Sequence, residues 1–248
     1  MIIRTDREWE GMREAGRLAA EVLRVTADAV EPGMTTLEID AVCRKAMKDL
    51  GCTSASLGYH GYPGALCVSV NEEVIHGIPG PRVVNVGDVV SLDVCVRSAD
   101  GFFGDNCKTL AIGVTDPAVI ELVEGTDRAL AAGIAAVRPG AHLSDVSAAV
   151  EKVAREHRLG VVREFCGHGI GRALHESPEV LNYGRPGRGP VLKEGMVFCI
   201  EPMLTRGSAR ITVLDDKWTV VASDGLFAAH SEHMVAVVPG GAEILTPR

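Results

Sequence analysis

The sequence lacks any apolar run approaching the roughly 20 residues that a membrane-spanning helix needs. Its first residues, MIIRTDREWEGMREAG, carry acids where a secretory signal peptide has an apolar stretch. Basic residues are also in deficit, because 25 Lys and Arg oppose 33 Asp and Glu, for a net charge of −8. That balance would repel a phosphate backbone and argues against general nucleic-acid binding. We therefore expect a cytoplasmic protein whose ligand is a cation or a cationic partner.

The cysteines form no framework. Seven are scattered along the chain without a CxxC pair: Cys43, Cys52, Cys67, Cys95, Cys107, Cys166 and Cys199. Neither a disulfide scaffold nor a zinc ribbon is predicted, and we expect reduced thiols. With 248 residues, 46% of them hydrophobic, the chain can bury a substantial core as one large domain or two fused halves.

A weak internal repeat relates two parts of the chain. Residues 29–46 read AVEPGMTTLEIDAVCRKA, and residues 136–153 read AVRPGAHLSDVSAAVEKV. Both contain Pro-Gly, then Thr or Ser before an acid, then apolar residues at helical spacing, which predicts the same helix start twice. A chance likeness between two amphipathic helices is the alternative.

Segments typical of strands follow each repeat. The expected strands are 64–71, 83–96 and 107–114, then 161–171, 196–203, 218–223 and 233–239. Helices followed by strands, twice over, predict an α+β fold in which two related halves, roughly 1–120 and 121–248, share one sheet. A site lined by both halves would lie at the seam between them.

The stretch 93-DVCVRSADGFFGD-105 places two aspartates in segments that otherwise read as strands. Alternation puts Asp93 on the more polar face, and SADG supplies a turn. With the turn centred on Ala99, Asp93 would stand directly opposite Asp105, with Cβ atoms about 4.5–5.5 Å apart. Carboxylates this close repel unless one is protonated or a cation lies between them. Two solvated acids near a turn are the alternative reading.

Three further candidate ligands come from the second half: His168 in CGHGIG, Glu201 in VFCIEPM and Glu232 at the mouth of the last predicted strand. Taken singly, a packed histidine, a buried salt bridge and a solvated strand edge would explain them. Together with the aspartates they suit two divalent ions about 3.5–4 Å apart. Four carboxylates and one imidazole favour Mn, Fe or Co and admit Zn, whereas the lack of cysteine among the five disfavours a structural zinc site.

The motifs VNEEVIHGIP, SLDV, GFFGDNCKT, CGHGIG, LHE, FCIEPM and SEHM, in that order, resemble the type I methionine aminopeptidases in their compact bacterial form, over nearly the whole chain. The resemblance implies a single pita-bread domain over 1–248, with a curved central antiparallel sheet and helices outside. It implies a metalloprotease with two divalent ions (Co, Mn, Fe or Zn) that removes the initiator methionine of nascent proteins when the second residue is small. A monomer, with the ribosome as a candidate partner, also belongs to this expectation.

The resemblance also assigns roles to residues. It makes Asp93, Asp105, His168, Glu201 and Glu232 the dimetal ligands, with Asp105 and Glu232 bridging both ions. His76 and His175 resemble the two histidines that contact substrate without binding metal. Residues Tyr59, Tyr62, Cys67 and Trp218 fall where the methionine side-chain pocket is lined. Leu174 stands where many bacterial relatives carry an aromatic residue, which affects the shape of the pocket and not the chemistry.

The mechanism expected from this set is metal-assisted peptide hydrolysis. A hydroxide shared by the two ions would attack the first peptide carbonyl. Glu201 would take the proton of the water and pass it to the leaving amine. His175 would stabilise the charge that develops on the carbonyl oxygen, and His76 would hydrogen-bond the amide nitrogen of the second residue.

Two other functions fit parts of the sequence. One is a different enzyme on this fold, a peptidase that cuts before proline or a creatine-type hydrolase, but those relatives generally carry an additional N-terminal domain for which 248 residues leave no room. The other is a binding protein that has lost catalysis, which would be expected to lack a ligand, whereas all five are present. Assays with Met-Ala and Xaa-Pro peptides would distinguish the first alternative from a methionine aminopeptidase. Metal analysis with one peptide assay would distinguish the second.

Overall fold

Two helix starts stand at equivalent places in the two halves of the chain. The computed structural model, which describes residues 1–247, contains α2 (Thr36–Asp49) and α4 (Leu143–Glu156). At the third position of each helix, Glu38 or Asp145 accepts a hydrogen bond from the backbone N–H of the preceding cap residue. This satisfies an amide that the helix itself leaves without a partner. Both helix starts predicted from the Pro-Gly repeat are therefore confirmed.

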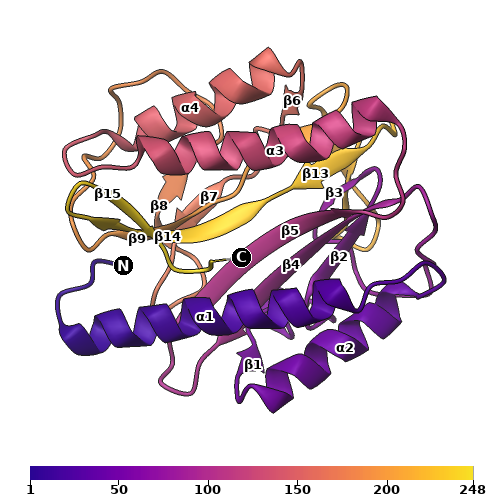
Figure 1. The fold of residues 1–248 in the computed structure, drawn as a ribbon, viewed down its shortest axis with the longest axis horizontal. Coiled ribbons are helices and arrows are strands. Elements are labelled where there is room, and N and C mark those ends of the chain that lie inside the picture. Colours follow the sequence, from indigo (N-terminus) through magenta and orange to yellow (C-terminus); the bar gives the residue numbers. More distant parts are fainter. Residues whose placement is uncertain (248) are drawn as a thin grey trace.

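Two longer helices lie outside the predicted segments. They are α1 (Asp6–Asp28), capped by the Thr5 hydroxyl, and α3 (Pro117–Ala136), capped by the Asp116 carboxylate with proline at its first position. Figure 1 shows α1 and α2 along one half of the sheet and α3 and α4 along the other. Within residues 1–247, no helix combines the length and the apolar character that crossing a membrane would require.

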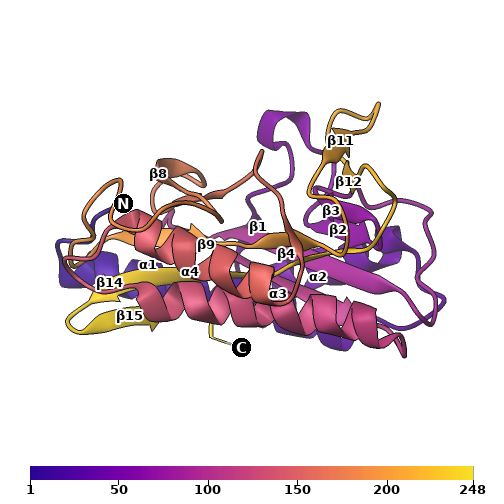
Figure 2. The same cartoon turned by 90° about the horizontal axis from the view of Figure 1, so that it is seen from above.

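One large antiparallel sheet runs through both halves. Its order is β1 (Thr53–Ser54), β4 (Val89–Arg97), β5 (Phe103–Ala111), β14 (Glu232–Val238), β9 (Val197–Ile200), β7 (Gly167–Gly169) and β8 (Glu176–Val180), with β2 (Cys67–Val70) on β4 and β15 (Gly241–Ile244) on β14. Two small sheets join β13 (Ala228–His230), β10 (Met203–Thr205) and β6 (Gly160–Val161), and β11 (Ile211–Val213), β12 (Val220–Ala222) and β3 (Glu73–Ile75). Figure 2 shows the helices on one side of the sheet and loops with short strands on the other. The predicted fold class, a curved central sheet with helices outside, is confirmed.

Each predicted strand segment overlaps an observed strand, but most are too long, and 107–114 starts too late because β5 begins at Phe103. Segment 83–96 is a strand only from Val89, because Gly87 turns the chain with a φ of 101°. Segment 161–171 breaks into β6 and β7. Among residues 1–247, six short strands lie outside the predicted segments altogether: β1, β3, β8, β11, β13 and β15.

The β4–β5 hairpin decides how the paired aspartates are arranged. Asp93 pairs with Cys107, and Cys95 pairs with Asp105, so the predicted register, with the two aspartates directly opposite, is wrong by two residues. Gly101 takes a left-handed φ of 78° and centres the turn one residue later than predicted. A shift of two residues keeps both carboxylates on one face of the sheet, as diagonal neighbours.

Alternation along β4 separates the core from the opposite face. Val90, Leu92 and Val94 are buried against the α1 and α2 side in one apolar cluster. Asp93 and Cys95, which alternate with them, point to the other side of the sheet. The same strand therefore anchors two helices and presents polar groups to the face that carries the site.

Candidate metal centre

Five adjacent strands of the large sheet each bring in one of the five predicted ligands. Asp93 lies on β4, Asp105 on β5, Glu232 at the start of β14, Glu201 just after β9 and His168 on β7. These strands are neighbours in that order, so residues far apart in sequence meet on one face. All five line a cavity of about 530 Å³.

The ligand atoms lie within coordinating reach of one another. His168 Nε2 is 3.5 Å from Glu201 Oε1 and 3.7 Å from Asp105 Oδ2. Single donor atoms of Asp105, His168 and Glu232 all lie within 4.8 Å of one another. Since oxygen and nitrogen ligands bind divalent metals at about 2.0–2.2 Å, donors at these separations can share an ion.

Hydrogen bonding prepares His168 for such a role. Its Nδ1 lies 3.0 Å from the carbonyl oxygen of Gly169, which can only accept. Nδ1 therefore carries the proton, and the Nε2 lone pair faces the carboxylates. Burial, and then the neighbouring His175, lowers the pKa of His168 to about 4, so the ring is neutral near pH 7.

The four carboxylates disfavour one another's ionisation. Burial raises the pKa of Asp93 to about 6. The pKa of Asp105 is raised well above its usual range by burial and then by Asp93, and those of Glu201 and Glu232 by burial and then by Asp105. Among the described residues, neither lysine nor arginine lines the cavity. The donor set therefore fits divalent cations, which would supply the missing positive charge.

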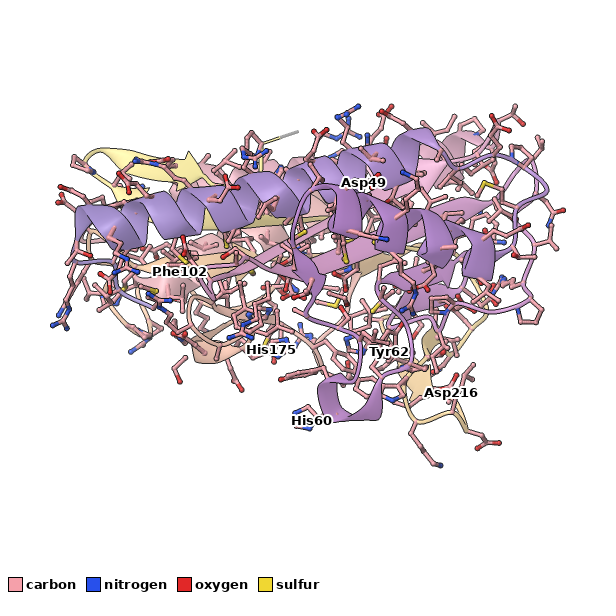
Figure 3. The ribbon with its side chains drawn as sticks, turned by 90° about the horizontal axis from the view of Figure 1, so that it is seen from below. Asp49, His60, Tyr62, Phe102, His175 and Asp216 are labelled. Atoms are coloured by element: carbon pink, nitrogen blue, oxygen red, sulfur yellow. The ribbon has the colours of Figure 1, made fainter. Side chains whose placement is uncertain are left out.

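The remaining predicted site residues line the same cavity: Tyr59, Tyr62, Cys67, His76, Leu174, His175 and Trp218. The rings of Tyr62 and Trp218 meet edge to face with centroids 5.1 Å apart, and Trp218 lies 6.0 Å from His76. Figure 3 shows His175 and Tyr62 on the side of the sheet away from α1 and α2. The cavity is thus lined in one part by the acidic side chains and in another by the rings of Tyr59, Tyr62 and Trp218, which we call the aromatic wall.

His76 is held in an unusual backbone conformation. It follows β3 directly and has a φ of 60°, a left-handed value that is uncommon outside glycine and recurs at functional sites. Burial, and then His175, lowers its pKa to about 4. At neutral pH the ring is uncharged and can donate one hydrogen bond and accept another.

Three residues that the sequence motifs do not single out also adjoin the centre. Cys95 donates from its sulfur to Asp105 Oδ1 at 3.1 Å. Cys199 groups with Asp105 as a candidate ligand, and His230 Nε2 lies 3.7 Å from Glu201 Oε2. The signal for Cys95 was the alternation that places it on the same face as Asp93, whereas the other two were not distinguishable from core residues.

Comparison with known proteins identifies the family. A sequence profile described as metallopeptidase family M24 matches residues 10–239. The chain belongs to metallopeptidase family M24. A methionine aminopeptidase of Clostridium perfringens is 42% identical over 246 residues, which cover 99% of this chain and 98% of that protein. The resemblance to methionine aminopeptidases is confirmed, and so is a metal-dependent hydrolase.

Solved structures agree with this assignment. A methionine aminopeptidase of Thermotoga maritima superposes on this M24 chain with a TM-score of 0.97 at 42% identity, over the full length of both. The prolidase of Pyrococcus furiosus has a TM-score of 0.79 at 21% identity, and this chain covers 66% of it. That second likeness shows a shared fold alone, in a longer protein.

Proposed function

We propose that this M24 peptidase is a dimetal methionine aminopeptidase that releases an N-terminal methionine when the second residue is small. The observation that carries the proposal is the convergence of one donor from each of five adjacent strands on one cavity. The matched relatives are named methionine aminopeptidases at 42–44% identity over nearly their full length, which supports the choice of substrate.

Asp93, Asp105, His168, Glu201 and Glu232 would hold two divalent ions, with Asp105 and Glu232 shared by both. Co, Mn, Fe and Zn all suit this oxygen-rich set with one imidazole. When bound, the ions supply a hydroxide at neutral pH and Lewis acidity toward the substrate.

In this mechanism, side chains of the protein transfer the protons and stabilise the charge that develops on the substrate. Glu201, which lines the cavity and whose pKa is raised by burial, takes a proton from the attacking water and delivers it to the leaving amine. His175 donates to the carbonyl oxygen of the scissile bond as charge develops there. His76 hydrogen-bonds the amide nitrogen of the second residue.

The aromatic wall accounts for the preference for methionine. Tyr59, Tyr62, Cys67, Leu174 and Trp218 would enclose the thioether side chain, because sulfur packs favourably against aromatic rings. Leu174 is 5% exposed and has no ring, so it leaves the pocket wider than an aromatic residue at this position would.

The proposed substrate is a product of protein synthesis. Nascent proteins carry the N-terminal methionine, so we propose a cytoplasmic enzyme that acts on them as a monomer, with the ribosome as a candidate partner. The two halves, roughly 1–120 and 121–248, would form a single catalytic domain.

The decisive experiment uses metal-stripped protein re-supplied in turn with Mn, Fe, Co and Zn. We expect cleavage of Met-Ala-Ser, little cleavage of Met-Leu-Ser and none of an Xaa-Pro peptide. Glu201→Gln should fold and lose nearly all turnover, whereas Glu194→Gln, at an exposed position, should match the parent. Hydrolysis of the Xaa-Pro peptide in preference to Met-Ala-Ser would overturn the proposed substrate.

A further inference from the structure

Cys95 brings a sulfur atom into the carboxylate cluster. It lies on β4, two residues after Asp93 and directly across the ladder from Asp105. Cys95 is 8% exposed and lines the cavity together with both aspartates. The sulfur is therefore inside the candidate metal centre.

The distances around Cys95 match those between ligands of one ion. Its Sγ is 3.1 Å from Asp105 Oδ1 and 3.7 Å from Asp93 Oδ1, and single donor atoms of the three residues lie within 4.8 Å of one another. Zinc binds sulfur at about 2.3 Å and oxygen at about 2.0–2.2 Å, which puts a sulfur and an oxygen on one tetrahedral ion about 3.5 Å apart.

Cys199 is the competing thiol. It groups with Asp105, His168 and Glu232, but it is completely buried and does not line the cavity. Cys95 differs because its sulfur contacts two carboxylates at the cavity surface, where an ion and its proton can enter and leave.

We propose that Cys95 is an additional metal ligand, which shares one cation of the centre with Asp93 and Asp105 and biases that position toward thiophilic ions such as Zn²⁺ and Co²⁺. The inference rests on the proposed dimetal function and names a selectivity that the five oxygen and nitrogen ligands do not provide. On binding, the S–H bond breaks, the proton leaves to solvent, and the sulfur electron pair forms the bond to the ion. No oxidation or reduction is involved.

Softness is the physical basis of the bias. Thiolate prefers zinc and similar ions, whereas carboxylates also suit the harder Mn²⁺. Replacing the sulfur by oxygen should therefore weaken Zn²⁺ binding more than Mn²⁺ binding. An S–H group that merely donates to Asp105 would give no such difference, since it never contacts the ion.

The test is an anaerobic titration of metal-free protein with Co²⁺, followed by optical spectroscopy and metal analysis. Visible ligand-field bands and bound cobalt report the proposed centre, while a near-ultraviolet sulfur-to-cobalt charge-transfer band reports Cys95. We expect the parent to show both and Cys95→Ser to keep the ligand-field bands without the charge-transfer band. In competition assays, Cys95→Ser should lose Zn²⁺ affinity by about tenfold or more, with a much smaller change for Mn²⁺.

Cys107→Ser is the control, because this fully buried thiol lies on β5, does not line the cavity, and donates to the carbonyl oxygen of His230, a bond that serine can keep. It should retain both signals. Cys95→Ala replaces Cys95→Ser in the test if Cys95→Ser does not fold.

Bound cobalt without a charge-transfer band in the parent would overturn the Cys95 assignment and leave the proposed function standing. Loss of the band in Cys199→Ser but not in Cys95→Ser would also overturn it. Failure to bind cobalt would reject the centre and the inference together.

Discussion

The Tyr59 hydroxyl lies 2.7 Å from Nδ1 of His175. Burial raises the pKa of Tyr59, which keeps the phenol protonated, and burial with the nearby His60 lowers the pKa of His175, which keeps the imidazole neutral. The phenol therefore donates to Nδ1, and the proton of His175 resides on Nε2 as a hydrogen-bond donor. In the proposed mechanism, this Nε2 proton is the one that His175 would donate to a substrate oxygen.

Tyr59→Phe keeps the ring in the pocket wall and removes this bond. Because one hydrogen bond contributes about 0.5–1.5 kcal/mol, kcat on Met-Ala-Ser should fall about 2- to 12-fold, with a smaller change in KM. Tyr183→Phe, whose ring packs on the Arg163 guanidinium, is the control and should leave kcat unchanged. Equal kcat for Tyr59→Phe and the parent would show that the bond does not orient His175.

Asp105→Asn tests the carboxylate that is proposed to be shared by both ions. The amide is a weak metal ligand and cannot neutralise two cations, so both metal content and turnover should be lost while the fold persists. Metal analysis and the Met-Ala peptide assay measure the two effects. Asp49→Asn is the control, on the helix side away from the cavity (Figure 3). A variant of Asp105 with the parent's metal content and rate would show that the dimetal assignment is wrong.

Metal-free protein should lose stability as pH rises through the acid range. The folded-state pKa of Asp93, about 6, is higher than the value of about 3.9 in an unfolded chain, so the folded protein holds this proton more tightly. The stability that results is complete below about pH 4 and is lost as pH rises through about 6. Melting in EDTA at pH 5 and pH 7.5 measures the loss, and Asp93→Asn should show less of it. A parent curve no steeper than that of Asp93→Asn would contradict this account.

Added metal should have the opposite pH dependence. Metal competes with protons for the carboxylates, so Mn²⁺ should stabilise the protein more at pH 7.5 than at pH 5. A ligand at 100 times its Kd stabilises by about 2.7 kcal/mol, which corresponds to a Tm increase of about 5–10 °C for a protein of this size. Equal Mn²⁺-induced increases in Tm at the two pH values would argue against carboxylate ligands.

Gly104→Ala should destabilise the fold at the α1–β5 contact. A Cβ at this position would lie 2.2 Å from the carbonyl oxygen of Ala15, so the helix has to move away from the strand. Overpacking of this kind costs about 1–3 kcal/mol, which thermal or urea unfolding will detect. Gly80→Ala is the matched control, since its Cβ would meet only the Ile78 oxygen at 3.8 Å. Equal stabilities for the two variants would show that the helix adapts without cost.

Local patterns were enough to predict several elements. The Pro-Gly repeat located the starts of α2 and α4, and valine alternation placed Asp93 on the face away from the core. Such signals depend on cap chemistry and side-chain periodicity, which act over a few residues. The register of the β4–β5 hairpin was predicted wrongly, because Gly101 takes the left-handed position at the end of the three-residue turn 99–101. The predicted turn, centred on Ala99, would have put Asp100 at that position instead.

The amino-acid sequence alone determined the donor chemistry of this protein: an acidic chain with carboxylates and a histidine embedded in strand-like segments, in a family-specific order. Only the tertiary structure decided that β4, β5, β14, β9 and β7 are neighbours, and that Cys95 and the Tyr59–His175 pair belong to the same cavity. The reason is physical, since strand order and ring-to-ring contacts depend on pairing and packing between separate segments, including β5 with β14 and Tyr59 with His175, which lie more than 100 residues apart. Residue type and alternation, by contrast, are properties of each segment.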